Sequence, residues 1–231
     1  MSLAGITLGS GITLGSGIVV GPSPSQNLIL SLDASNPTSY PGSGTTWVDL
    51  STSNNNFTLQ NSPTWTSNGR TSYFTFSSGY AESNTAILPN TAYTKIAIFR
   101  VAGAFGNIIS GGITSDDHAF WGNNSTTLYS GHNGSWTTVG SSTTVPLNQW
   151  VFAAVSFNTT TGWRLYLNNE FPVTSSNTDT FSPTPSIVEI GAYLNSNNLG
   201  GDVALVQIYN AALPDSVISA LYSQYQSRFV Y

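Results

Sequence analysis

The stretch GDVALVQIYNAAL at residues 201–213 is the part of the sequence that decides the fold. Its segment 203–209 is rich in β-branched and apolar residues, which favours a strand. Pro214 and Asp215 follow closely, and both residue types suit the first turn of a helix. An apolar stripe then recurs at helical spacing: Val217, Ile218, Leu221, Tyr222 and Tyr225. The sequence therefore predicts a strand followed by a short C-terminal helix that lies across a sheet.

Similar short segments lie upstream, separated by clusters of Gly, Asn, Ser and Pro. The expected strands are 28–32, 72–76, 94–101, 107–110, 119–121, 126–130, 150–157, 163–167, 187–192 and 203–209. In the strand at 163–167, three apolar residues alternate with Arg164 and Tyr166, which is typical of a strand with one buried face. Many short strands with turn signals between them indicate an all-β sandwich or barrel.

The composition excludes several classes of protein. Only 6% of the 231 residues are charged, the net charge is −5, and no two of the five basic residues adjoin. Nucleic-acid binding needs clustered Lys and Arg and is therefore not expected. There is no cysteine, which excludes disulfides and thiol chemistry. No apolar run is long enough to span a bilayer, and the start lacks the pattern of a signal peptide. We expect a soluble chain that is made in a cytoplasm.

The N-terminus contains a six-residue repeat: GITLGS at 5–10, GITLGS at 11–16 and GIVVGP at 17–22. Because six is even, an extended chain presents the same face in every repeat. The apolar face would hold Ile6, Leu8, Ile12, Leu14, Ile18 and Val20. Such a strand must pair to satisfy its backbone. We expect residues 1–25 to be an extended assembly arm with a proline joint, and residues 26–231 to be one domain. A flexible Gly/Ser linker is the alternative.

Three stretches together resemble the laminin-G-like, concanavalin-A-like jelly-roll domains of phage virion proteins. They are LILSLDASNP at 28–37 with SYPGSGTTWVDLS at 39–51, WRLYLN at 163–168, and residues 201–213 with Tyr222 and Phe229. The resemblance implies a two-sheet antiparallel jelly-roll sandwich of about twelve strands. It does not imply a single function, because this fold carries many.

Two functions follow from the resemblance and the arm. The first is a phage virion structural protein, located in the virion, that displays the jelly roll as a capsid decoration, head fibre or tail-associated module. Its arm would bind other virion proteins or copies of itself, giving a homo-oligomer. The alternative is a carbohydrate-binding module that recognises host surface glycans.

Enzymatic activity and a bound cofactor are not expected. Glucanases of this fold carry spaced carboxylates on one strand, whereas the three glutamates Glu82, Glu170 and Glu189 have no such partner. No glycine-framed nucleophile accompanies His118 or His132 either.

The loops after residue 115 contain the candidate ligand-binding residues. Asp116 and Asp117 are the only adjacent acidic pair, compatible either with a Ca²⁺ site or with a solvated turn whose aspartates cap local amides. Indole, imidazole and amide groups follow within about twenty residues, as a small-ligand site requires. The candidate glycan-binding residues are Trp121, Asn123, His132, Asn133 and Trp136. The alternative is that both tryptophans pack in the core.

Overall fold

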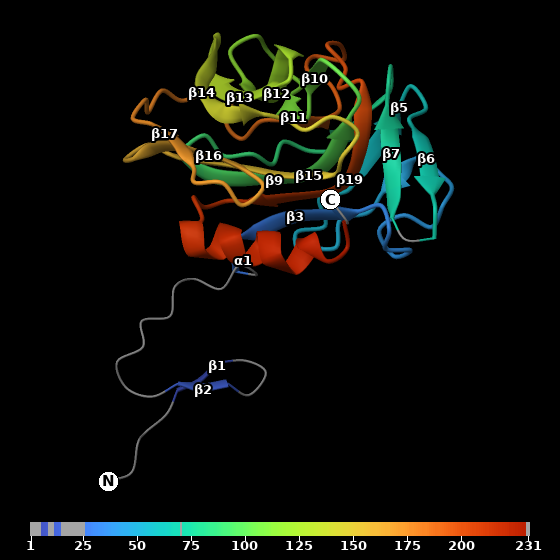
Figure 1. Ribbon diagram of the computed structural model, residues 1–231, viewed down its shortest axis with the longest axis horizontal. Helices are drawn as coiled ribbons and strands as arrows, with labels where there is room; N and C mark the ends of the chain where they lie inside the picture. Colours follow the sequence, from blue (N-terminus) through green and yellow to red (C-terminus); the bar gives the residue numbers. More distant parts are fainter. Residues whose placement is uncertain (1–5, 9–11, 15–25, 70, 230–231) are drawn as a thin grey trace.

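The computed structural model describes residues 6–8, 12–14, 26–69 and 71–229, and shows an all-β sandwich with one helix (Figure 1). The strand pairings are antiparallel. This confirms the predicted jelly-roll class and the helix at the C-terminal end. The strands are more numerous than the resemblance implied, because the structure adds strands at 46–47, 57–60, 64–67, 80–83, 135–144 and 173–175 that the sequence pattern did not predict.

The larger layer is an eight-stranded sheet in which β19 lies near the centre. Along the sheet, β19 pairs β9 on one side, and β7 and β3 along different parts of the other. Its strands, from one edge to the other, are β17 (Val173–Ser175), β16 (Gly162–Leu167), β15 (Val151–Asn158), β9 (Ala92–Val101), β19 (Gly201–Tyr209), β7 (Ser72–Phe76) and β6 (Thr64–Ser67), with β3 (Leu28–Asp33) beside β19.

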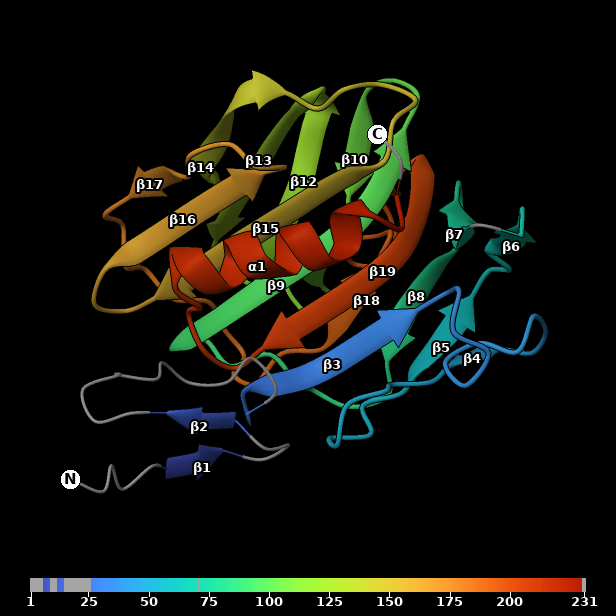
Figure 2. The ribbon, with the colours of Figure 1, turned by 60° about the horizontal axis from the view of Figure 1, so that its bottom comes forward.

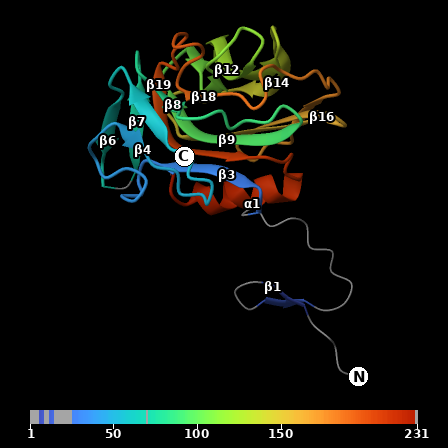
Figure 3. The same ribbon diagram turned by 180° about the vertical axis from the view of Figure 1, so that it is seen from behind.

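The opposite layer consists of two smaller sheets instead of one. The five-stranded sheet has the order β11 (Ile109–Gly111), β18 (Val188–Ile190), β8 (Tyr80–Ser83), β5 (Phe57–Gln60) and β4 (Thr46–Trp47). The four-stranded sheet has the order β10 (Phe105–Asn107), β12 (His118–Ser125), β13 (Thr127–His132) and β14 (Ser135–Thr144). The expected strand 107–110 is therefore wrong as one element, because its residues divide between β10 and β11. Figure 3 shows β8, β12, β14 and β18 on one side of β9.

Aromatic side chains fill the space between the two layers. Trp47, Phe74 and Trp163 are at most 1% exposed, and the rings of Trp47 and Phe74 lie 4.7 Å apart. Burial of such large side chains is the main favourable contribution to folding. One continuous cluster of buried residues includes inward-facing positions of all three sheets, so the two small sheets and the large sheet enclose a single core.

The helix α1 (Asp215–Gln226) covers the outer face of the large sheet (Figure 2). Its buried residues are Ile218, Leu221 and Tyr225, which pack in one cluster with Phe152 of β15. The predicted apolar stripe is thus confirmed. One detail differs: Tyr166 of β16 alternates with the core residues but is only 4% exposed, because α1 covers the face that a half-buried strand would present to water. No helix among the described residues is long and apolar enough to cross a lipid bilayer.

The described part of the N-terminal repeat is a two-stranded ribbon. Strand β1 (Ile6–Leu8) pairs β2 (Ile12–Leu14) antiparallel, with Ile6 opposite Leu14 and Leu8 opposite Ile12. Successive repeats of the same chain thus pair with each other, and the pairing of the arm with other copies or with a virion protein stays a prediction. Ile18 and Val20, the last two predicted arm residues, and the proline joint at 22–25 lie outside the described residues.

Candidate functional site

The outer face of the four-stranded sheet carries a group of aromatic side chains. Trp121 of β12 lies opposite Tyr129 of β13 and Asn107 of β10, so these positions share one face. Their neighbours Phe120 and Leu128 belong to the core. Since side chains alternate between the two faces of a strand, this places Trp121 on the side that points away from the large sheet.

Trp121 and Trp136 line one pocket of about 150 Å³ on this face. Its lining residues are Asn107, Ala119, Trp121, Trp136, Tyr193 and Asn197. Both indoles are half-buried, so the alternative that they pack wholly inside the core is wrong. Three aromatic residues beside two asparagines match what a small polar ligand with apolar faces requires.

Hydrogen bonds and ring contacts hold these aromatic groups in place. The Trp121 indole Nε1–H donates to the Trp136 carbonyl oxygen at 2.9 Å. The rings of Trp136 and Tyr193 meet edge to face, with centroids 5.4 Å apart and an interplanar angle of 63°. The Tyr193 hydroxyl donates to the Thr114 carbonyl oxygen at 3.0 Å. The pocket is thus preorganised, which reduces the conformational entropy lost on binding.

A loop between β18 and β19 supplies the far wall of the pocket. Tyr193 and Ser196 form an isolated antiparallel bridge, and the Asn107 side-chain Nδ2 donates to the Asn197 carbonyl oxygen at 3.1 Å. Leu194, Asn195 and Asn197 have φ values of 50°, 58° and 49°, a conformation that asparagine tolerates better than most residues. The asparagine-rich sequence of this loop was a signal for such a turn. Its proximity to Trp136 could not be predicted, since the two are far apart in sequence.

His132, predicted as a glycan-binding residue, lies beneath this face and is 2% exposed. Its Nδ1 lies 2.7 Å from the Asp179 carbonyl oxygen, and its Nε2 lies 2.7 Å from the Tyr93 hydroxyl. A carbonyl only accepts, so Nδ1 carries the proton and Nε2 accepts from Tyr93. Burial lowers the pKa of His132 to about 3, and the imidazole is neutral. Its role as a ligand contact is therefore wrong: its nitrogens are used inside the sandwich.

The neighbouring His118 and Asp117 are also buried. His118 Nδ1 lies 2.7 Å from Lys95 Nζ, and Asp117 accepts from Ser186 Oγ at 2.6 Å and from the His118 backbone N–H at 3.0 Å. Burial shifts the pKa of Lys95 well below its usual range and raises that of Asp117. These groups form a buried polar network between the layers.

The predicted Ca²⁺ ligands Asp116 and Asp117 differ in environment. Asp116 is exposed, whereas Asp117 is fully buried. Among the residues described here, no group of three or more histidine or acidic side chains is arranged to hold a metal ion. Ca²⁺ binding at this pair stays the alternative that the sequence left open beside a solvated turn.

Asn123 and Asn133 are exposed and have φ values of 21° and 49°. Neither lines the pocket. Asn133 occupies the turn between β13 and β14. The structure thus brings together Trp121 and Trp136 from the predicted set, places both asparagines elsewhere, and adds Asn107, Tyr193 and Asn197.

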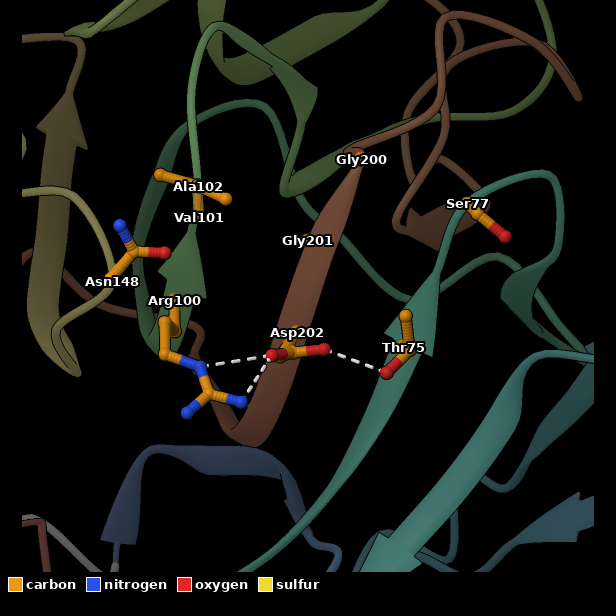
Figure 4. Close-up of a pocket in the computed structure, with 9 residues that line it drawn as sticks. All are labelled: Thr75, Ser77, Arg100, Val101, Ala102, Asn148, Gly200, Gly201 and Asp202. Carbon is orange, nitrogen blue, oxygen red and sulfur yellow. Dashed lines mark hydrogen bonds and ion pairs between the residues drawn. The ribbon is translucent and has the colours of Figure 1, made fainter.

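A larger hollow of about 360 Å³ lies at the ends of β7, β9 and β19 (Figure 4). Its charged groups bind one another: Arg100 Nε and Nη2 donate to Asp202 Oδ2 at 3.0 and 2.6 Å, and Thr75 Oγ1 donates to Asp202 Oδ1 at 2.7 Å. The Arg100 guanidinium also lies over the Trp150 ring, 4.8 Å from its centroid. These groups join three strands, and their charges are already compensated.

A family model described as the concanavalin A-like lectin/glucanase superfamily (Laminin_G_3) matches residues 77–219. The chain belongs to this superfamily. The match includes the aromatic pocket and most of both layers. No curated protein sequence is significantly similar to the chain.

Solved structures with the same fold include carbohydrate-binding proteins. Domain 4 of AbnA, an extracellular arabinanase from Geobacillus stearothermophilus solved with arabinotriose, has a TM-score of 0.67 at 13% identity, covering 85% of this chain and 98% of that one. A mutant of Trypanosoma rangeli sialidase with trans-sialidase activity has a TM-score of 0.64 at 15% identity, covering 89% of this chain and 34% of the sialidase.

A third similar structure comes from a study of botulinum neurotoxin type C, whose cell entry depends on two ganglioside molecules. It has a TM-score of 0.59 at 15% identity, covering 87% of this chain and 51% of the toxin chain. The chain spans only about a third of the sialidase, as the 34% coverage shows. At these identities, the likeness shows the shared fold.

Proposed function

We propose that the jelly-roll domain is a carbohydrate-binding module that uses the pocket between Trp121, Trp136 and Tyr193. The observation that carries this proposal is the convergence of three fixed aromatic rings, with Asn107 and Asn197 beside them, in one pocket at the outer face of the four-stranded sheet. Sugars present apolar C–H faces that stack on aromatic rings and hydroxyls that bond to amides. Structural neighbours solved with arabinotriose or linked to gangliosides support the same class of ligand.

The module is proposed to bind its ligand without cleaving it. Glu82, Glu170 and Glu189 do not line the aromatic pocket. Glu170 accepts from Thr143 Oγ1 at 2.7 Å, and Glu189 is fully buried. Hydrolysis of a glycoside requires two carboxyl groups on either side of the scissile bond, and the pocket itself supplies none.

The test is a glycan array that includes arabino-oligosaccharides and sialylated oligosaccharides, followed by affinity measurements on the best probe. Trp136→Ala is expected to weaken binding about tenfold or more, through loss of one stacking surface, and to leave the melting temperature nearly unchanged. Phe171→Ala is the matched control, since this phenylalanine is 96% exposed and lies outside the pocket. Equal affinity in Trp136→Ala and the wild type would place any bound sugar elsewhere.

We further propose that the chain is a virion structural protein, located in a phage particle, that displays this domain through its N-terminal repeat. The support is the resemblance of residues 28–51, 163–168 and 201–213 to virion jelly rolls, together with the pairing of β1 and β2. The register of the ribbon places Ile6 opposite Leu14 and Leu8 opposite Ile12. In the sequence, the even-numbered repeat places these four residues on one face of an extended chain, and an apolar row of this kind favours association with further copies or with a virion protein.

Removal of residues 1–21 tests this second role. The shortened chain is expected to fold and to remain a monomer in size-exclusion chromatography with light scattering, whereas the full chain forms an oligomer or binds virions. The replacement of Leu8 and Leu14 by Thr is a milder version with the chain length unchanged. Unchanged assembly in both variants would remove the arm from the assembly mechanism.

A further inference from the structure

Two glutamates face each other across neighbouring strands of the five-stranded sheet. Glu189 of β18 is directly opposite Glu82 of β8. The flanking residues Val188 and Ile190 belong to the core, so both carboxyl groups lie on the outer face. Like charges directly opposite each other destabilise a sheet, so this pair calls for a physical explanation.

The loop between β18 and β19 covers one of the two carboxyl groups. Glu189 is 0% exposed, although Asn195 in the loop is itself exposed. The Asn195 backbone N–H lies 3.2 Å from Glu189 Oε1 and 3.1 Å from Oε2. A methyl group placed on Gly112 would lie 2.9 Å from Glu189 Oε1, which shows how closely the surrounding backbone encloses the carboxyl group.

The same loop forms a wall of the aromatic pocket. Tyr193 lies two residues before Asn195, and Asn197 lies two residues after it; both line the pocket. The Leu194 N–H donates to the Gly111 carbonyl oxygen at 3.3 Å, at the end of β11. Movement of the loop away from Glu189 would therefore displace the ring that contacts Trp136.

We propose that Glu189 is a positioning residue for the aromatic pocket: its protonation favours the closed loop and so strengthens ligand binding as the pH falls. This inference rests on the proposed carbohydrate-binding function. The Glu82 carboxylate raises the pH at which the change occurs, because it disfavours the ionised form of Glu189.

The electrostatic surroundings of Glu189 determine the direction in which its pKa is shifted. Burial raises the pKa of Glu189 to about 7; the Asn195 N–H opposes this rise, and the Glu82 and Asp117 carboxylates add to it. Burial also raises the pKa of the two nearby phenols, Tyr80 and Tyr193, so both stay neutral in the relevant range.

Opening of the loop would hydrate the Glu189 carboxyl group and return its pKa toward the ordinary glutamate value. The closed state therefore binds the proton more tightly than the open state. By linkage, closure becomes more favourable as the pH falls from about 7 toward about 4.5. Above pH 7 the ionised carboxylate prefers water and opposes closure, whereas the Asn195 N–H and the bonds from Leu194 to Gly111 and from Asn107 to Asn197 still favour the closed loop.

Two readouts on the full-length chain test the inference. The first needs no ligand: the indole N–H signals of Trp121 and Trp136 in ¹⁵N-labelled protein are followed by NMR between pH 4.5 and 8.5. We expect both to titrate with a midpoint near that of Glu189. The second readout is the affinity for sialyllactose and for arabinotriose, with an expected gain of about tenfold between pH 8 and pH 5.5 for the probe that binds.

Three variants separate the contributions of Glu189 and Glu82 to the pH-dependent change. Glu189→Gln should hold both indole signals at their low-pH positions and remove the pH dependence of binding. Glu82→Gln should lower the midpoint, and it provides the test if Glu189→Gln does not fold. Glu170→Gln, at an exposed glutamate, is the control and should titrate like the wild type.

The outcomes distinguish the two proposals. Indole signals that titrate in the same way in the wild type, Glu189→Gln and Glu82→Gln would overturn the role of Glu189. Indole signals that follow Glu189 while neither sugar binds at any pH would support Glu189 as the residue that positions the pocket, and would overturn carbohydrate binding by these probes instead.

Discussion

The two layers of the sandwich differ in whether their strands are buried on both faces or on one. In the large sheet, β9 and β15 are buried along almost their whole length, because the core covers one face and α1 the other. In the four-stranded sheet, β12, β13 and β14 have one core face and one partly exposed face, and the polar network of His118 and His132 lies beneath. The comparison indicates that the large sheet is stabilised on both faces, whereas the small sheet leaves one face free for the proposed ligand site.

The largest expected loss of stability comes from a substitution that removes packing between α1 and the large sheet. Leu221→Ala removes a buried side chain of α1, which is 6% exposed, and should lower the free energy of unfolding by about 2–5 kcal/mol. Denaturant titration measures this change. In the absence of denaturant, where the variant is folded, its affinity for sugar should equal that of the wild type. A loss below half a kcal/mol would mean that α1 contributes little to the stability of the large layer.

A smaller effect is expected in the small sheet, at two glycines of one hairpin. A Cβ on Gly131 would lie 1.9 Å from the Ser135 carbonyl oxygen, so Gly131→Ala should cost about 1–3 kcal/mol through displaced backbone. Gly134 has a φ of +80° and open space around it, so Gly134→Ala should cost about 1 kcal/mol from backbone strain alone. Thermal unfolding of both variants compares them, and equal losses would contradict the close approach of the strands at Gly131.

The buried histidines beneath the small sheet make the stability of the fold depend on pH. The pKa of His132 is lowered to about 3 in the fold, so below its unfolded value the unfolded chain binds the extra proton. Stability is therefore lost as the pH falls through this window, by about 2 kcal/mol between pH 6.5 and pH 5. His118 adds in the same direction.

Glu189 changes the stability of the fold with pH in the opposite direction to the two histidines. Its pKa is raised to about 7, so its contribution to stability is present below the unfolded value and is lost as the pH rises from about 4.5 to about 7. The free energies of unfolding of the wild type, His132→Gln and Glu189→Gln, measured across pH 5–8, separate the effect of His132 from that of Glu189. His132→Gln should flatten the acid side of the profile, and an unchanged acid slope would argue against a neutral, buried His132.

The smallest expected effect lies at the exposed start of α1. Asp215 accepts from Arg164 Nη1 at 3.0 Å and from the Tyr166 hydroxyl at 2.7 Å, but Asp215 and Arg164 are 55% and 46% exposed. Asp215→Asn should therefore cost less than about 1 kcal/mol, and the difference should shrink in high salt. A loss as large as that of Leu221→Ala would show that the helix is held by charge and not by its apolar face.

Much of the large layer could be predicted from the sequence, because its signals are local. The expected strands 72–76 and 163–167 differ from β7 and β16 by at most one residue, and the stripe through Leu221 predicted the buried face of α1. The small layer was harder. Residues 107–110 belong to two different sheets, and no local pattern marks the point at which the chain passes from one sheet to the other.

The sequence by itself determined the all-β class, the C-terminal helix and the pairing tendency of the repeat at residues 5–22, since each follows from alternation or spacing within a few residues. Only the tertiary structure decided which residues form the proposed ligand site. Trp121 and Trp136 are neighbours because β12, β13 and β14 are adjacent in one sheet, and Tyr193 reaches them through a loop some sixty residues away that Glu189 and Asn107 hold in place. The burial of His132 and Asp117 has the same cause: the stacking of two layers, which depends on the whole chain, removes water from both groups.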